Sequence, residues 1–424
     1  MTITDTARLP RWRLTGGAFA TALRYGISAA GPVAVSGAHF LASLIFLRNL
    51  PAHEFGLFSF VMVVVSFGMS LNVSLISVPI TRNLVTGETG TRPICFQINW
   101  LVCALFAALL FTALLVGHAP LIESAMLGLF GGVFTFRWYA RCFAFVDNRM
   151  TAAIRSDFVY SVSLVAGLGL LAFTRQVSFT SGSEMLLGAA LLALVPFGAA
   201  FFRTQFAAMR GNPVRYWPIF RDLTRWSLIG VVLTEITVNA HAYLVTFISG
   251  PGSFALLALG MLLFRPASLM QSALPDVERP VMARAMAAHD PATVARVQRN
   301  FNYGLLAAWA GNLILCAVLL AFFPLLVLKK GYALNDVILV AGLSAIIMLV
   351  RAWRTPPAVL LQAAGQFKEL ASIGTVSGAV SVAATLALLL TLGPIASLAG
   401  ILMGELVILF RVRQMARDWW KAHG

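Results

Sequence analysis

The sequence is poor in charged residues. Only 11% of its 424 residues are Asp, Glu, Lys or Arg, whereas a water-soluble surface needs roughly a quarter. Hydrophobic residues make up 59%, and the mean hydropathy is +0.85. We therefore expect an integral membrane protein. Twelve spans of about 20 residues would use roughly 240 residues and leave on the order of 14 for each loop or tail, so no separate soluble domain fits.

Motifs for nucleotide-driven or hydrolytic chemistry are also missing. The sequence contains no phosphate-binding G-x-x-x-x-G-K-[ST], no zinc-binding H-E-x-x-H and no G-x-S-x-G nucleophile turn. Its six histidines are scattered, and the acidic residues of the predicted outer links, Glu54, Glu184 and Asp336, are isolated. Direct ATP drive and enzymatic activity are not indicated, and we predict no cofactor and no metal.

The four cysteines show no metal-binding or disulfide spacing. None belongs to a C-x-x-C or Cys/His pattern, and all lie in or beside apolar runs. We predict that they are small core residues: Cys95, Cys103, Cys142 and Cys316.

Long continuous apolar runs predict about twelve transmembrane helices, because spans in lipid satisfy their backbone internally. The runs lie near 26–47, 55–80, 95–117, 119–138, 156–174, 185–203, 226–248, 252–275, 301–325, 335–353, 369–391 and 393–411. Several links are only a few residues long, so neighbouring helices form antiparallel hairpins.

The distribution of Lys and Arg predicts the orientation, since these residues resist translocation. With the N-terminus inside, 26 of the 31 fall in inner segments and four in outer loops. Both termini are therefore predicted to be cytoplasmic. The net charge of +15 follows mostly from topology, so nucleic acid is not a predicted partner.

The two halves resemble each other. Leu50-Pro51 followed by Phe55 has a counterpart in Gly250-Pro251 followed by Phe254, about 200 residues later, and Arg24 before the first helix corresponds to Arg225 before the seventh. We predict two parallel six-helix repeats around a central cavity. The expected segments are a basic N-terminal segment 1–24, a lobe 25–203, a basic and aromatic linker 204–225, a lobe 226–411 and a tail 412–424.

Arg265 is the most informative charge. It lies about 14 residues into the run 252–275, near the bilayer midplane, where a cation costs at least about 3 kcal/mol unless it faces water or a partner. Pro266 follows directly and should kink the helix. The guanidinium suits an anion such as a phosphate. The alternative is a structural ion pair with Glu235.

A second group of polar residues is predicted inside the membrane. Glu235 and Asn239 share one face of the seventh helix, and a buried carboxylate can carry a proton, so Glu235 is a coupling candidate or the partner of Arg265. His241 is a further cavity candidate, with hydrogen-bonded packing as its alternative. Glu405 follows the G-x-x-x-G of Gly400 to Gly404, a pattern that also marks close helix packing.

Arginines at the inner helix ends have two interpretations. They can set topology and contact lipid headgroups, or they can line the inner mouth of the cavity and attract an anionic headgroup. The stretch from Arg203 to Arg225, with its five arginines and several aromatic residues, indicates an interfacial segment on anionic lipid. The arginines are Arg24, Arg225, Arg137, Arg141, Arg351 and Arg354.

The segment 46–58 resembles the signature between the first two helices of Wzx-type polysaccharide flippases. It combines Arg48, a short spacer, Glu54 and the aromatic-Gly pattern of Phe55 to Phe58. The second-half echo at 251–259, the segment from Pro280 to Arg284 and the Arg-rich link after the fourth helix agree with it. The resemblance covers nearly the whole chain in helix count and repeat, and it extends to the multidrug/oligosaccharidyl-lipid/polysaccharide (MOP) exporter superfamily.

This resemblance implies that an undecaprenyl-pyrophosphate-linked oligosaccharide is flipped across the bacterial cytoplasmic membrane by alternating access, for surface polysaccharide synthesis. It implies a pyrophosphate contact at Arg265, Arg24 and Arg225. The second helix holds no charge, so either the cavity is less basic than in its relatives or Arg82 at the inner end takes that role. The predicted partners are the lipid-linked oligosaccharide, membrane lipids and polysaccharide polymerase machinery. An ion-coupled multidrug or small-molecule exporter of the same superfamily, and a scaffold subunit of a synthesis complex, remain as alternatives.

Overall fold

The computed structural model describes residues 18–77, 79–80, 91–147, 149–209, 212–323 and 332–423. Within these ranges every regular element is helical. The side chains of residues 18–30, including the predicted site residue Arg24, lie outside the described set, and so does Arg82.

The first half of the chain forms one bundle of helices, the N-lobe. Apart from a short π-helical turn, Val73–Ser77, that extends α2, its helices are α1 (Ala18–Asn49), α2 (Ala52–Asn72), α4 (Thr91–Val116), α5 (Leu121–Val146), α6 (Met150–Phe173), α7 (Phe179–Leu192) and α8 (Ala199–Ala208).

The second half forms the C-lobe. Short turns connect α8 to the C-lobe, whose helices are α10 (Arg225–Ile248), α11 (Pro251–Leu263), α12 (Arg265–Ala287), α13 (Pro291–Phe322), α15 (Leu334–Ala363), α16 (Phe367–Leu392) and α17 (Ser397–His423).

The predicted all-helical membrane fold is confirmed. Nine helices of the described chain are long and apolar enough to cross a membrane, and the bent pair α11–α12 makes ten. With α5 and α17, which carry buried charges, the long helices match the twelve predicted runs in order. On α4, Leu101, Leu105 and Leu109 are all more than half exposed at helical spacing, as expected of a face that contacts lipid.

One predicted apolar run is divided in the structure. The sixth apolar run was placed at 185–203, but α7 begins at Phe179 and ends at Leu192, and α8 is a separate helix. A short 3-10 turn containing Pro196, followed by Gly198 in the left-handed region (φ 82°), divides the run. Both residues interrupt a helix, although the surrounding sequence stays apolar.

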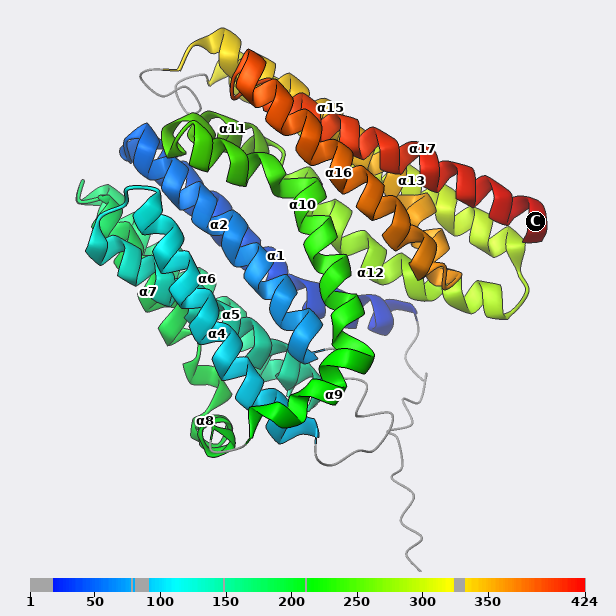
Figure 1. Ribbon diagram of the computed structural model, residues 1–424, viewed down its shortest axis with the longest axis horizontal. Helices are drawn as coiled ribbons and strands as arrows, with labels where there is room; N and C mark the ends of the chain where they lie inside the picture. The colour runs from blue at the N-terminus through cyan, green and yellow to red at the C-terminus, as the bar shows by residue number, and fades with distance from the viewer. Residues whose placement is uncertain are drawn as a thin grey trace, which may run out of the picture.

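The two lobes meet through α2 and α11 and diverge from there, so that the molecule forms a V (Figure 1). The contact needs a glycine, because a Cβ on Gly56 would lie 1.8 Å from the carbonyl oxygen of Pro251. Both residues belong to the repeated sequence segment noted above. The V closes at the end predicted to face outward and opens toward the end where α17 finishes.

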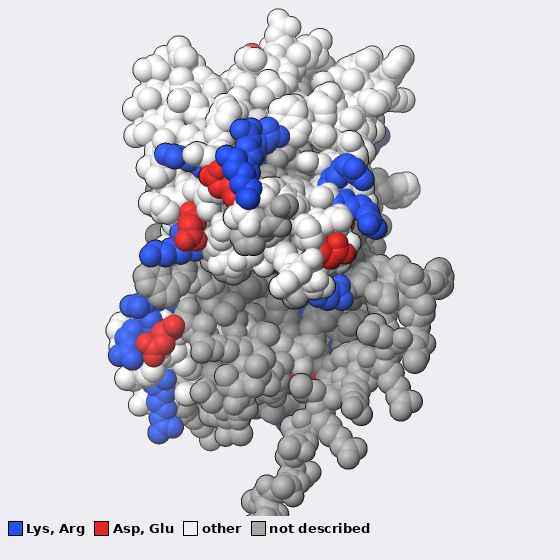
Figure 2. Space-filling model, turned by 90° about the vertical axis from the view of Figure 1, so that its right-hand side faces the viewer, with Lys and Arg blue, Asp and Glu red and all other residues white. Residues whose placement is uncertain are grey.

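Charged side chains are concentrated at that open end. Figure 2 looks at the molecule from the side on which α17 ends, and its described surface carries Lys and Arg with fewer Asp and Glu below a broad uncharged region.

A glycine contact also holds α17 against α16, since a Cβ on Gly400 would lie 2.3 Å from the backbone nitrogen of Thr385. This is the close helix packing that the G-x-x-x-G spacing predicts.

Candidate functional site: a cationic cavity between the lobes

A cavity of about 210 Å³ lies between the lobes. Helices α1 and α2 form one wall, and α10, α11, α12 and α15 form the other. Most of the lining is apolar, aromatic or hydroxylic. The charged and amide side chains in it are Asn239, Arg265 and Arg351.

Arg265 stands at a break in its span. Helices α11 and α12 are bent by 63° at Phe264, immediately before Arg265, as the sequence predicts from Pro266. The bend places the guanidinium at the cavity wall instead of along a continuous lipid-facing helix.

A buried amide stabilises the break. Asn312 of α13 donates from Nδ2 to the carbonyl oxygen of Leu263 (2.9 Å) and accepts at Oδ1 from the backbone N–H of Ala267 (3.1 Å). In a straight helix these two backbone groups would bond to each other. The side chain of Asn312 therefore replaces one backbone hydrogen bond and satisfies both groups, which lipid could not do.

Arg351 is the second cation of the cavity, and it is held by an ion pair on its far side. Its Nε lies 2.7 Å from one carboxylate oxygen of Glu405, and the Nε of Arg354 lies 2.5 Å from the other. The Glu405 side chain is fully buried, whereas those of Arg351 and Arg354 are 15% and 22% exposed. Glu405 thus orients a cavity cation without itself lining the cavity.

The charges of the cavity are unbalanced. No acidic residue lines it, and within the described ranges no carboxylate forms an ion pair with Arg265. The alternative interpretation was an ion pair between Arg265 and Glu235, and the described residues do not form it. The hydroxyl of Tyr243 donates to Glu235 at 2.5 Å instead, while Asn239, one turn further on α10, reaches the cavity.

The two buried histidines differ in their partners. Nε2 of His39 lies 2.7 Å from the hydroxyl of Tyr160, so this histidine is a hydrogen-bonded packing residue. His241 is also buried, but neither of its ring nitrogens has a hydrogen-bond partner among the described residues; its nearest ring neighbour is Phe254, at 6.2 Å.

The predicted pyrophosphate set is only partly assembled. Arg265 lines the cavity, Arg225 is exposed at the first residue of α10 and is not part of the lining, and the side chain of Arg24 is outside the described set. From the sequence, Arg351 is only one of six arginines that can line the inner mouth of the cavity, and Asn312 is not selected at all. A basic residue at a helix end and a lone polar residue in an apolar run were the available signals.

The N-lobe contains a matching clamp that sequence reasoning also missed. Arg137 Nη2 and Arg141 Nε, one turn apart on α5, bind the two oxygens of Asp157 on α6 at 2.5 and 2.8 Å. Arg137 is fully buried and also lies over the ring of Tyr160 at 4.7 Å. In each lobe, then, two arginines of the fourth long helix neutralise one buried carboxylate.

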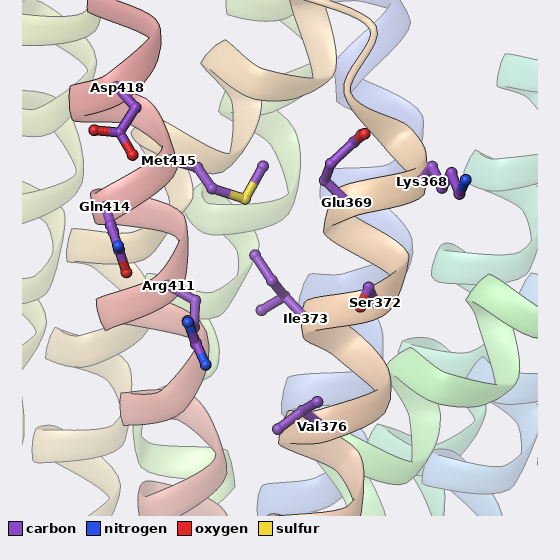
Figure 3. Close-up of a pocket in the computed structure, with 9 residues that line it drawn as sticks. All are labelled: Lys368, Glu369, Ser372, Ile373, Val376, Arg411, Gln414, Met415 and Asp418. Atoms are coloured by element: carbon purple, nitrogen blue, oxygen red, sulfur yellow. The ribbon is translucent and has the colours of Figure 1, made fainter.

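A larger pocket of about 480 Å³ lies away from the centre, between the predicted cytoplasmic halves of α16 and α17 (Figure 3). Its lining carries both signs of charge, Lys368 and Arg411 against Glu369 and Asp418, and Lys368 points away from α17. This pocket lies within one lobe and its lining carries both signs of charge, so the cavity between the lobes is the stronger candidate for the functional site.

No protein-family model matches the sequence, and no curated protein is similar to it. Solved structures are similar in fold. A multidrug resistance MATE family transporter of the MOP superfamily, in an inward-facing conformation, superposes with a TM-score of 0.68, with 12% identity over 94% of this chain and 100% of that one.

The lipid II flippase MurJ, in an inward closed conformation, gives a TM-score of 0.66 with 12% identity over 91% of this chain and 87% of that one. A MOP superfamily transporter from Pyrococcus furiosus, described by a reversed polarity of its binding pocket that suggests a different function, gives 0.54 with 12% identity over 95% and 94%.

The chain therefore has a two-lobed helical fold that it shares with these solved structures. More specifically, its fold is that of the MOP superfamily transporters, and these structural neighbours are transporters and not enzymes.

Proposed function

We propose that the protein flips a polyprenyl-pyrophosphate-linked oligosaccharide between the leaflets of a bacterial cytoplasmic membrane, by alternating access of the cavity between its lobes. The observation that carries this proposal is the charge of the cavity. Arg265 and Arg351 line it, no acidic residue does, and Arg265 has no carboxylate partner in the described chain. A pyrophosphate supplies the missing negative charge.

The two guanidinium groups suit this ligand because each offers several N–H donors in a plane, which match phosphate oxygens in pairs. Arg351 keeps its orientation through Glu405 while its other donors remain available. Hydroxyl groups from both lobes, including Ser59 and Ser268, and the rings of Phe55 and Phe254 offer the mixed polar and aromatic surface that sugars require.

The size of the cavity indicates which part of the substrate it holds in this conformation. At about 210 Å³ it is smaller than the roughly 300–1,000 Å³ of pockets for drug-sized ligands. It accommodates a pyrophosphate with its first atoms of sugar or lipid. The glycan requires the lobes to separate further, with the α2–α11 contact at Gly56 as the axis.

The competing function is an ion-coupled exporter of small molecules. A MATE fold is compatible with it. Acidic groups favour a site for organic cations, however, whereas the charged lining here is cationic. The polarity of the cavity favours an anionic substrate, and with it the flippase.

The remaining parts of the proposal follow from the sequence. We place both termini in the cytoplasm, assign Glu235 with its hydrogen bond from Tyr243 as the coupling group, and expect polysaccharide polymerase machinery downstream of the flipped lipid.

A gene deletion tests this proposal. Loss of the protein should cause lipid-linked oligosaccharide to accumulate on the cytoplasmic side, and wild type should relieve the accumulation while an equally expressed Arg265→Ala variant should not. Arg411→Ala is the matched control, since it removes the same charge from outside the cavity. Unchanged surface polysaccharide and no accumulation after deletion would contradict the flippase and favour the small-molecule exporter.

A further inference from the structure

A second cationic site lies far from the central cavity, in a groove between α13, α15 and α17. Two adjoining hollows of about 210 and 320 Å³ form it, and they share Gln298, Asn302 and Trp420. The groove belongs entirely to the C-lobe and therefore does not depend on how the lobes open.

The lining of this groove is basic and aromatic. It includes Arg299, Arg413 and Arg417 but no acidic residue. Arg413 and Arg417 lie one turn apart on α17, and the structure gives neither an ion pair in the described chain. The guanidinium of Arg413 lies 5.6 Å from the centre of the Trp353 ring, which fixes it at the wall of the groove.

The groove lies at the depth of lipid headgroups. Helix α13 has 32 residues and is about 48 Å long, whereas the hydrocarbon core of a membrane is about 30 Å thick. The stretch from Asn302 to Phe322 spans about 30 Å and matches the core, so Asn302 falls at the interface. Trp353 and Trp420 at this level agree with the aromatic belts of membrane proteins.

One lining group needs a hydrogen-bond donor. The Oδ1 atom of Asn302 is buried and has no partner, while Trp420 Nε1 already donates to Gln298 Oε1 at 3.1 Å. An amide oxygen only accepts, so a phosphodiester anion, which carries no O–H group, cannot satisfy it. A phosphodiester that carries a hydroxylated headgroup offers both an anion for the arginines and a donor for Asn302.

We infer that this groove binds the headgroup of an anionic glycerophospholipid of the phosphatidylglycerol type, with the phosphodiester on Arg413 and Arg417 and a glycerol hydroxyl on Asn302. Basic pockets between transmembrane helices are suited to such headgroups. The site is separate from the proposed transport cavity and holds on either orientation of the chain, because both leaflets contain phospholipid.

The pocket in Figure 3 provides the contrast. It lies on the other side of α17, and its arginine, Arg411, faces a lining that also contains Glu369 and Asp418. Removal of charge there should leave binding of an anionic lipid unchanged, which makes Arg411 a control on the same helix.

The test is titration of the purified full-length protein in detergent with short-chain phosphatidylglycerol, followed by native mass spectrometry. We compare wild type, Arg413→Gln/Arg417→Gln, and the control Arg411→Gln/Lys368→Gln, which removes the same charge from the pocket in Figure 3. The first double variant should bind at least tenfold more weakly, whereas the control should bind as wild type does. Asn302→Leu should lose the preference for phosphatidylglycerol over phosphatidylmethanol, a phosphodiester of the same charge whose headgroup has no hydroxyl.

Three results would overturn the inference: equal weakening in the control, equal binding of phosphatidylcholine, or displacement of the lipid by millimolar inorganic phosphate, which would show a free anion site. A fourth result would also overturn it: tighter binding of undecaprenyl pyrophosphate than of phosphatidylglycerol would assign the groove to the transport substrate. The lipid-free melting temperature of each variant checks folding, and Arg413→Lys/Arg417→Lys, which keeps the charge, should restore binding in part.

Discussion

Replacement of Asn312 by leucine should destabilise the protein by exposing the break between α11 and α12 to an apolar core. Leucine has a similar volume but no amide, so the carbonyl of Leu263 and the N–H of Ala267 lose their partners together. They cannot simply bond to each other, because Pro266 clashes with the preceding turn and keeps the helix bent.

The magnitude follows from the two groups that are left unpaired. Each buried, unsatisfied polar group costs about 1–3 kcal/mol, so the substitution should cost about 2–6 kcal/mol of unfolding free energy. Local relaxation and residual partners in the membrane reduce such values, and we expect the lower half of this range.

A second substitution separates this cause from a general packing defect. Pro266→Ala allows α11 and α12 to form one continuous helix, in which Ala267 N–H donates to Leu263 C=O directly. The double variant should therefore recover at least half of the stability that Asn312→Leu loses. It should not recover transport, because straightening moves Arg265 from the cavity wall.

The assay is the free energy of unfolding in mixed micelles titrated with sodium dodecyl sulfate, measured for both single variants and the double variant. A loss below about 1 kcal/mol for Asn312→Leu would refute the hydrogen-bond account. Additive effects of the two substitutions would refute the role of the proline.

The other contacts give three further predictions. Gly56→Ala should block transport while the protein still folds, because the added Cβ meets the Pro251 carbonyl and forces α2 away from α11. Transport and thermal stability are measured on the same variant. A variant that transports at the wild-type rate would contradict the prediction. Glu405→Gln should lower the free energy of unfolding by about 3 kcal/mol, the low end for a broken buried ion pair, because the two arginines that it binds are partly exposed. A denaturant titration measures this loss, and an unchanged unfolding midpoint would contradict it. Asp157→Asn should lower the free energy of unfolding more than Glu405→Gln does, because its partner Arg137 is fully buried. The reverse order would show that burial does not determine the stability of these ion pairs.

Much of the fold is predictable from the sequence because it depends on local composition. Apolar runs bounded by Arg, Pro or Gly define the spans, and Pro266 next to Arg265 correctly predicts a break with a cation at it. The failure at α7 has a local cause too, since Pro196 and Gly198 interrupt an otherwise apolar run.

The partners inside the membrane are not predictable in this way. Asn312 lies 49 residues from Leu263, and Glu405 lies 54 from Arg351. Which residues meet depends on how the helices cross, and a periodic sequence pattern does not contain that information. The sequence therefore identifies buried charges as important, as for Arg265 and Glu405, but leaves open whether each faces the cavity or another helix.

The most direct test of the central claim is transport in vesicles. Purified protein is reconstituted with a fluorescently labelled polyprenyl-pyrophosphate sugar, and an impermeant quencher reports the fraction in the outer leaflet. Wild type should equilibrate the lipid, Arg265→Ala should slow it at least tenfold, and Arg265→Lys should restore part of the rate. Protein that leaves this lipid in place but moves organic cations, with Arg265→Ala as active as wild type, would contradict the account.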